Sequence, residues 1–101
     1  PIPMSEKANL FVPQTDNHET VLETVCRRFS EEFGGATVRR DHEGYWVDDD
    51  GNLVDDTVDV AFTYDDDIDE TVVKELAEYV KAELGEDAVL YTIEEAKTAF
   101  V

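Results

Sequence analysis

Four arginines lie close together in the sequence and could bind an anion. Arg27, Arg28, Arg39 and Arg40 make up half of the eight Lys and Arg residues, and His42 follows them. A guanidinium group holds a carboxylate or a phosphate through two parallel hydrogen bonds. Arg39, Arg40 and His42 are therefore candidate ligands for a small organic anion. The alternative is that the arginines form ion pairs with neighbouring carboxylates, which are far more numerous.

Two adjacent aromatic residues are candidates for contact with a partner or a ligand. Trp46 is the only tryptophan of the chain, and it follows Tyr45. Large apolar side chains gathered on a surface usually mark an interaction site. Trp46 could anchor a homodimer, cover apolar residues of its own hairpin, or stack against a ligand, and the sequence leaves these three explanations open.

Covalent catalysis would need a nucleophile with a nearby base, and the sequence offers no such pair. Cys26, the only cysteine, lies on the apolar side of a predicted helix, where burial keeps a thiol protonated and inert. His18 and His42 have no nucleophile at a recognisable spacing. Pro1 could act as an amino-terminal proline base, but Pro3 would interrupt the core strand that such a base begins. We therefore expect no catalytic residue.

The acidic turn at residues 48–52, Asp-Asp-Asp-Gly-Asn, has the oxygen ligands and the glycine of a calcium loop. Aligned on that glycine, however, an EF-hand would place Trp46 and Thr57 at two essential ligand positions. The acidic run at residues 65–67 is better explained by the preference of carboxylates for a helix N-terminus. We expect no metal and no cofactor.

Net charge is the strongest signal in the composition. The chain has 26 Asp and Glu residues against 8 Lys and Arg, which gives a formal net charge of -18. Such self-repulsion opposes compaction at ordinary ionic strength, whereas molar salt shortens the Debye length to about 3 Å. The composition is that of a halophilic archaeal protein. An acidic nucleic-acid mimic is the alternative, and direct binding of nucleic acid is not expected.

Composition also limits the size of the fold and the compartment. A chain of 101 residues suits one domain, and a hydrophobic content of 42% argues against disorder. The single cysteine fits a reducing compartment. No apolar run approaches the roughly 20 residues that a membrane span needs. These features predict a cytoplasmic protein without a membrane partner.

Hydrophobic periodicity predicts the elements that must position the candidate residues. One helix should begin near Asp16, with Glu19 completing a capping box, and end at Gly34. A second should run from about residues 67–69 to Gly85. Strands are expected at residues 8–12, 36–47, 53–64 and 88–93. Beyond them, the tail at 97–101 either continues the last strand past a kink at 94–95, or residues 94–98 form a helical turn.

The order β-α-β-β-α-β predicts an α+β, ferredoxin-like sandwich. It implies a four-stranded antiparallel sheet with two helices on one face. Residues 8–101 should form this single domain. Residues 1–7 should be a disordered start, in which Pro1 to Pro3 precede a natural-looking beginning at Met4.

The two middle strands should form a long hairpin around the Asp-Gly turn. At roughly 12 residues each, against a usual 5 or 6, they outrun the first strand and place Tyr45 and Trp46 near an overhanging tip. Alternation in the second arm predicts that one face of this strand meets the core while the other is solvated. The residues expected toward the core are Val58, Val60, Phe62 and Tyr64.

The sequence resembles a small bacterial family, a domain of unknown function. The matching stretches are residues 9–11, 29–38, 44–54 and 88–100, and the most specific of them is the hairpin from Gly44-Tyr45-Trp46 through Gly51. The family is often exported, whereas this sequence shows no export signal and is far more acidic. The resemblance implies a ferredoxin-like fold and transfers no catalytic residue.

Together these features predict a halophilic ferredoxin-like module that acts as a non-enzymatic binding or regulatory homodimer. The candidate ligand- or partner-binding residues are Arg39, Arg40, His42, Tyr45 and Trp46. One alternative is a dimeric α+β barrel enzyme that acts on a small organic anion. The other is the acidic nucleic-acid mimic.

Overall fold

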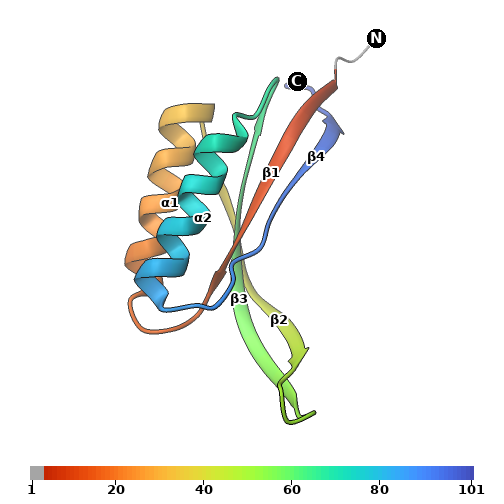
Figure 1. Ribbon diagram of the computed structural model, residues 1–101. Coiled ribbons are helices and arrows are strands. Elements are labelled where there is room, and N and C mark those ends of the chain that lie inside the picture. Colours follow the sequence, from red (N-terminus) through yellow and green to blue (C-terminus); the bar gives the residue numbers. More distant parts are fainter. Residues whose placement is uncertain (1–3) are drawn as a thin grey trace.

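Six elements follow one another in the predicted β-α-β-β-α-β order in the computed structural model, which describes residues 4–101 (Figure 1). Their bounds are β1 Met4–Pro13, α1 His18–Phe33, β2 Thr37–Val47, β3 Leu53–Asp65, α2 Glu70–Leu84 and β4 Tyr91–Lys97. The expectations for Pro1 to Pro3 concern residues outside this described part.

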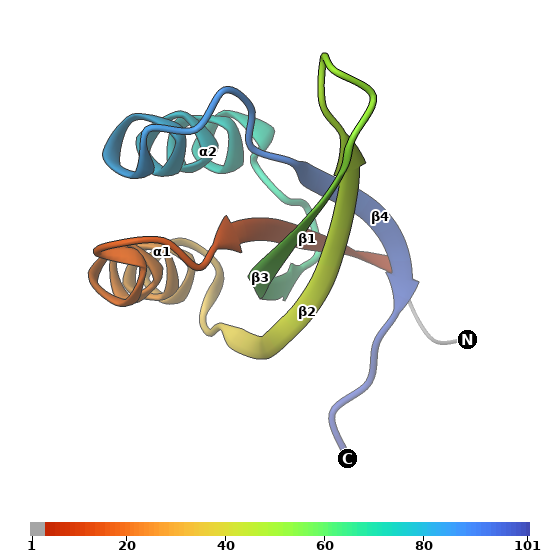
Figure 2. The same cartoon turned by 90° about the horizontal axis from the view of Figure 1, so that it is seen from below.

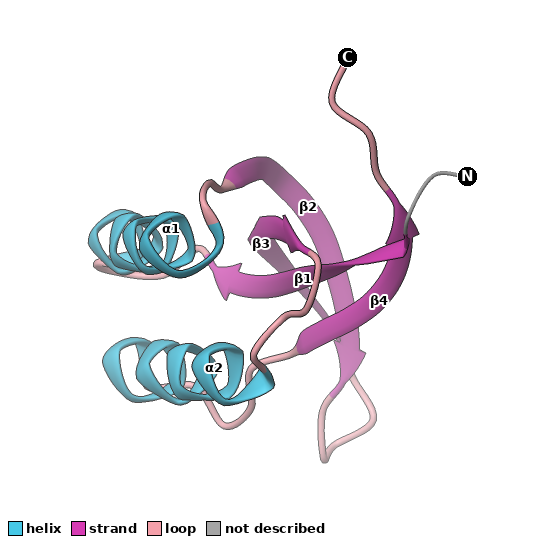
Figure 3. Cartoon of the chain, turned by 90° about the horizontal axis from the view of Figure 1, so that it is seen from above, coloured by secondary structure: helices cyan, strands magenta, loops and turns pink. Residues whose placement is uncertain are grey.

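The strands form one antiparallel sheet in the order β2-β3-β1-β4. Both helices cover the same face of this sheet, as Figures 2 and 3 show from opposite ends of the molecule. We call this the helix face and the other one the open face. The architecture confirms the ferredoxin-like α+β sandwich predicted from the sequence.

The core lies between the helix face and the two helices. Its fully buried members include Leu10 and Val12 of β1, Val25 and Phe29 of α1, and Val73 of α2. They come from the apolar stripes expected in the sequence, since residues at i, i+3 and i+4 share one side of a helix. The core therefore fixes the position of the helices over the centre of the sheet.

Both helices end at a glycine in the left-handed region, Gly34 at φ 92° and Gly85 at φ 64°. At the start of α2 the Asp69 carboxylate accepts a hydrogen bond from the Thr71 backbone N–H at 3.0 Å, which is an ordinary N-cap. No helix within residues 4–101 is long and apolar enough to cross a membrane.

The start of α1 differs from the prediction. Its N-cap is Asn17 at φ 70°, which makes no side-chain capping bond, so the expected capping box of Asp16 and Glu19 is absent. Glu19 instead accepts hydrogen bonds from Arg40 of β2. Because Glu19 forms this tertiary ion pair with Arg40, its carboxylate does not cap the helix.

Two strand boundaries also differ. Residues 4–7, expected in a disordered start, belong to β1, where Met4 pairs with Lys97 and Lys7 pairs with both Glu94 and Tyr64. β4 begins at Tyr91 rather than at residue 88 and continues through residues 94 and 95, so the helical turn expected as an alternative is wrong. The longer β1 pairs with β4 along its whole length. This pairing outweighs the weak local preference of residues 94–98 for a helical turn.

The faces of β3 are the reverse of the expectation. β1 and β3 pair with Leu10 opposite Ala61, so Ala61 lies on the helix face with its neighbours Asp59 and Thr63. The larger residues Val58, Val60, Phe62 and Tyr64 lie on the open face. Alternation identifies two faces without saying which one meets the helices. Here small residues at the centre of the sheet leave room for the bulky side chains of β1 and both helices.

The β2–β3 hairpin projects beyond the helices and curves away from them (Figure 1). Its turn is closed by hydrogen bonds from the Asp48 N–H to the Asn52 carbonyl at 2.9 Å and from the Gly51 N–H to the Asp48 carbonyl at 3.0 Å. Gly51 adopts φ 81°, which explains the glycine in this turn. The projection gives the molecule a long axis of 51 Å against 25 and 23 Å.

Candidate functional site

A β-bulge in β2 decides which side chains reach each face of the hairpin. Arg39 pairs with Val60 and His42 pairs with Val58, so two residues of β2 lie opposite Asp59 alone. The second of these, Asp41, has φ 61°. An extra residue reverses the alternation of a strand beyond it. His42, Gly44 and Trp46 therefore lie on the open face, although they would have faced the other way in a regular strand.

Asp59 holds this bulge in place. Its carboxylate is fully buried and accepts hydrogen bonds from the Asp41 backbone N–H at 3.0 Å, from Gln14 Nε2 at 2.8 Å and from Arg40 Nη1 at 3.0 Å. Burial alone would raise the pKa of Asp59, but the bonds from Gln14 and Asp41, with the charge of Arg40, outweigh it and leave the pKa below its usual value. Asp59 therefore stays ionised inside the protein.

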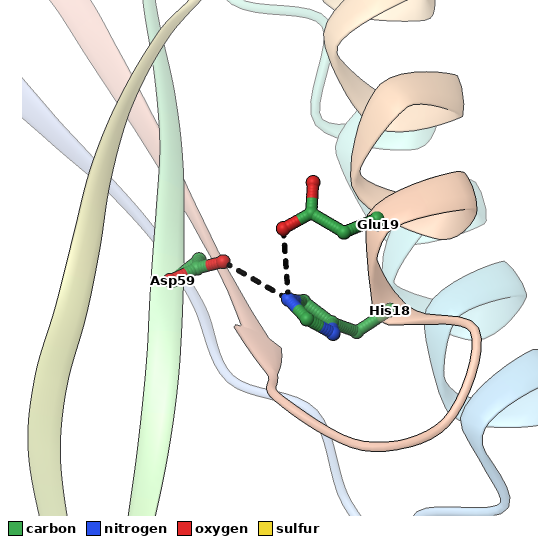
Figure 4. A group of neighbouring side chains, drawn as sticks. All are labelled: His18, Glu19 and Asp59. Carbon is green, nitrogen blue, oxygen red and sulfur yellow. Dashed lines mark ion pairs between the residues drawn. The ribbon is translucent and has the colours of Figure 1, made fainter.

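His18 and Glu19 complete this cluster at the start of α1 (Figure 4). His18 Nε2 lies 3.1 Å from Glu19 Oε1 and 3.5 Å from Asp59 Oδ2. That nitrogen is buried and makes no hydrogen bond with any residue in the range 4–101. Arg40 donates to both carboxylates, and its hydrogen bond is the main cause of the lowered pKa of Glu19.

The same three side chains have the donor types of a metal centre, since one ligand atom from each lies within 4.8 Å of the others. However, Arg40 Nη1 contacts both the Glu19 and the Asp59 oxygens that would face a cation. The guanidinium charge already balances these carboxylates. The arrangement is that of a structural ion-pair cluster, which ties α1 to β2 and β3.

The arginines expected to share an anion pocket point to different faces. Arg40 joins the Asp59 cluster, whereas the Arg39 guanidinium lies over the Phe62 ring on the open face, 4.6 Å from its centroid. Lys7 lies over the same ring at 4.6 Å. Such cation–π contacts stabilise both the cation and the ring. Within residues 4–101, Arg39, Arg40 and His42 therefore do not converge on one site.

Arg28 follows the ion-pair alternative, because its Nε lies 3.0 Å from Glu32 Oε1 and its Nη2 lies 3.7 Å from Glu75 Oε2. Cys26 of α1 is half-buried, and burial raises the pKa of its thiol. A protonated thiol is a poor nucleophile.

The structure does bring His42 and Trp46 together, in a cavity of about 540 Å³ on the open face. This cavity, which we call the Trp46 groove, lies between the hairpin and the segment that leads into β4. Its apolar lining comes from Phe11, Trp46, Val58, Val89 and Leu90. Its acidic side chains are Asp56, Glu86 and Asp87, and His42 also lines it. Glu43 borders the groove, but its carboxylate accepts a hydrogen bond from Tyr45 on the other side of the hairpin. The groove unites an exposed indole ring with three carboxylates.

Tyr45 lies on the other face of the hairpin. The pairs Tyr45 with Asp55 and Val47 with Leu53 alternate with that of Trp46 and Val54, so the first two pairs share one side. The Tyr45 hydroxyl donates to Glu43 Oε2 at 3.2 Å. Tyr45, Val47 and Leu53 are all largely exposed, Leu53 at 68%. The hairpin thus presents two different apolar surfaces.

Sequence reasoning missed Asp59, Gln14 and the acidic side of the groove. An aspartate placed between Val58 and Val60 was a signal, because a carboxylate inside a strand of apolar residues needs a partner once it is buried. Gln14 gave no signal of its own. The segment around Glu86 gave none either, since only the tertiary fold brings it opposite the hairpin.

Neither protein-family models nor the sequences of curated proteins match the chain. The expected resemblance to a bacterial family is thus supported only in its ferredoxin-like pattern. Solved structures do match over almost the whole chain. The divalent cation tolerance protein CutA1 of Thermus thermophilus has a TM-score of 0.65 at 16% identity, covering 95% of this chain and 87% of that one.

Two further structures extend the comparison. CutA1 of Oryza sativa has a TM-score of 0.64 at 14% identity, over 98% of this chain and 85% of that one. A phage SAM lyase in complex with S-methyl-5′-thioadenosine has a TM-score of 0.69 at 16% identity, over 92% and 82%. At such identities the likeness establishes the fold: this chain has the ferredoxin-like architecture that these proteins share.

Proposed function

We propose that the chain is a non-enzymatic binding module that self-associates through its β2–β3 hairpin, in the simplest case as a homodimer. The observation that carries this proposal is the exposed apolar side of the hairpin, formed by Tyr45, Val47 and Leu53. We call it the hairpin patch. It projects beyond the helices, where no other element within residues 4–101 covers it (Figure 1).

A second copy suits this surface because β2 is an edge strand of the sheet. The free backbone groups of an edge strand are a template for another strand. Antiparallel pairing of β2 with its own copy across a two-fold axis is self-complementary, as an isologous interface requires. It would place each hairpin patch beside its counterpart.

Binding rather than catalysis is supported by the way the polar groups are used. The most buried carboxylate, Asp59, is held by three donors, and the thiol of Cys26 has a raised pKa. The Asp59 carboxylate is therefore engaged within the fold, and the Cys26 thiol is a poor nucleophile.

The proposed setting is a salt-rich cytoplasm. Two chains of charge -18 repel one another, so association through the hairpin patch needs the screening that molar salt provides. Charge screening does not weaken the apolar contacts themselves, and kosmotropic salts strengthen them.

The test is sedimentation velocity at about 3 M KCl, where the Debye length is below about 3 Å. The wild type should sediment as a dimer or larger oligomer, and Val47→Asn/Leu53→Asn should sediment as a folded monomer. Met4→Gln, which changes another exposed apolar residue, is the matched control and should keep the wild-type assembly. A monomeric wild type at all salt concentrations would contradict the proposal.

A further inference from the structure

We propose that the Trp46 groove binds a small organic cation in which a primary ammonium or guanidinium head is attached to a flat apolar group. The groove lies on the face of the hairpin opposite the hairpin patch. The inference therefore stands independently of self-association and names a ligand class for a binding module.

The apolar part of the groove suits a flat ring. Trp46 is 53% exposed, and Phe11, Val58 and Leu90 form the neighbouring apolar wall. A volume of about 540 Å³ lies in the range of sites for small molecules. The indole face also attracts a cation through its quadrupole, more strongly than other aromatic side chains do.

The polar part of the groove selects the sign of the charge. Asp56 reaches it from the hairpin, and Glu86 and Asp87 reach it from the segment before β4. None of the three forms an ion pair within residues 4–101, and no Lys or Arg of that range lines the groove. Their negative charge is thus unbalanced, unlike that of the Asp59 cluster, where Arg40 provides the counter-charge.

The raised pKa of Glu86 agrees with an unbalanced negative charge in the groove. Burial raises its pKa, and repulsion from Asp56 and Asp87 raises it further. Asp56 is on the hairpin and Glu86 is across the groove, so the two sides share one negative field. A cation placed between them relieves this repulsion and is the ligand that the charges favour.

The experiment uses three ligands of similar shape and different charge: phenethylamine, 2-phenylethanol and phenylacetate. Trp46 is the only tryptophan, so its fluorescence reports directly on the groove. Titrations are done at about pH 8, where imidazole is ordinarily neutral, at the lowest salt concentration that keeps the protein folded. We expect phenethylamine to bind at least about tenfold more tightly than 2-phenylethanol, and phenylacetate to bind most weakly.

Charge variants separate the role of the carboxylates from that of the apolar wall. Asp56→Asn/Glu86→Gln should reduce the preference for phenethylamine to below about threefold while leaving the affinity for 2-phenylethanol unchanged. Glu78→Gln/Glu83→Gln removes the same amount of charge from the exposed side of α2 and should keep the preference. Equal loss in both double variants would attribute the effect to net charge alone and overturn the proposed site.

Two further results would overturn the proposal. One is equal or absent binding of the three ligands. The other is a Trp46 emission spectrum that shifts with protein concentration in the absence of ligand, because a second copy would then fill the groove. Sedimentation of the same samples keeps the two proposals apart, since amine binding by a monomer at low salt supports the groove, whereas the hairpin contact is decided by sedimentation at about 3 M KCl.

Discussion

Asp59 combines complete burial with an ionised carboxylate, and this is possible because three donors surround it. Its contacts reach both residues of the bulge, through the Arg40 guanidinium and the Asp41 backbone N–H. Removing one partner of a buried, hydrogen-bonded charge leaves the remaining donors unsatisfied. The stability of the bulge therefore depends on a single side chain.

We expect Asp59→Asn to lower the free energy of unfolding by about 3 kcal/mol, at the lower end for a buried charged pair because Arg40 remains half exposed to water. Asp55→Asn, an exposed position on the same strand and the same side, should change stability by less than about 0.5 kcal/mol. Urea unfolding at neutral pH measures both. Equal effects would contradict the role given to Asp59.

The pH dependence of this difference has a definite sign. The pKa of Asp59 is lowered in the folded state from its reference value of 3.8. Its stabilising contribution is therefore present above about pH 4 and disappears as the pH falls through the folded pKa. Unfolding measured from about pH 7 down to pH 2 should show the wild type and Asp59→Asn converging in acid. A constant difference would show that the charge is not responsible.

Among the elements, the two helices and the order of elements along the chain followed from the sequence, because apolar stripes and the glycines that end the helices are local signals. Val25 and Phe29, which are spaced as one side of a helix requires, are both fully buried. The faces of β3 did not follow, since alternation is symmetric with respect to the two sides of a sheet. The bulge at Asp41 was also invisible, because its left-handed backbone is stabilised by the distant residue Asp59.

The Trp46 groove shows the same limit. His42 and Trp46 were recognised as candidates, and their spacing puts them on one face of the strand. Which face this is depends on the bulge, and Glu86 reaches them through a contact between distant segments. Arg39 and Arg40 were expected together because they are adjacent in sequence. Adjacent residues of a strand point to opposite faces, and the structure places them accordingly.

The left-handed conformation of Asp41 gives a prediction at the level of the strand. At φ 61°, a β-branched residue is strained by roughly 1–2 kcal/mol, so Asp41→Val should lower the free energy of unfolding by at least that amount. Asp41→Gly removes the same side-chain bond to Gln14 without this strain and serves as the control. Thermal unfolding of both variants should rank them glycine above valine, and the reverse order would contradict the bulge geometry.

At the scale of the whole molecule, the charge of -18 should make folding dependent on salt. Screening takes the place of absent counter-charge, so the melting temperature should rise between about 0.1 and 3 M KCl. Circular dichroism at increasing KCl measures this. A melting temperature that is already maximal at the lowest salt would contradict the halophilic hypothesis.

A variant with less negative charge distinguishes screening from other effects of salt. Asp49→Asn/Glu78→Gln/Glu83→Gln removes three exposed carboxylates and should melt at a higher temperature than the wild type at low salt. At about 3 M KCl, with a Debye length near 3 Å or below, the two should be close. An equal gain at both salt concentrations would show that repulsion is not the cause.

The bulge in β2 also determines where this chain tolerates the loss of a residue. Losing one residue at positions 40–41 would leave a single residue opposite Asp59, while Arg39 and His42 would keep their partners Val60 and Val58. Directly paired residues share a face, so the groove and the hairpin patch would keep their composition. Losing one residue between His42 and Trp46, with regular pairing to β3, would instead turn Trp46 to the opposite face. Two codon deletions a few positions apart in the same strand would thus have opposite effects on the surface chemistry of the hairpin.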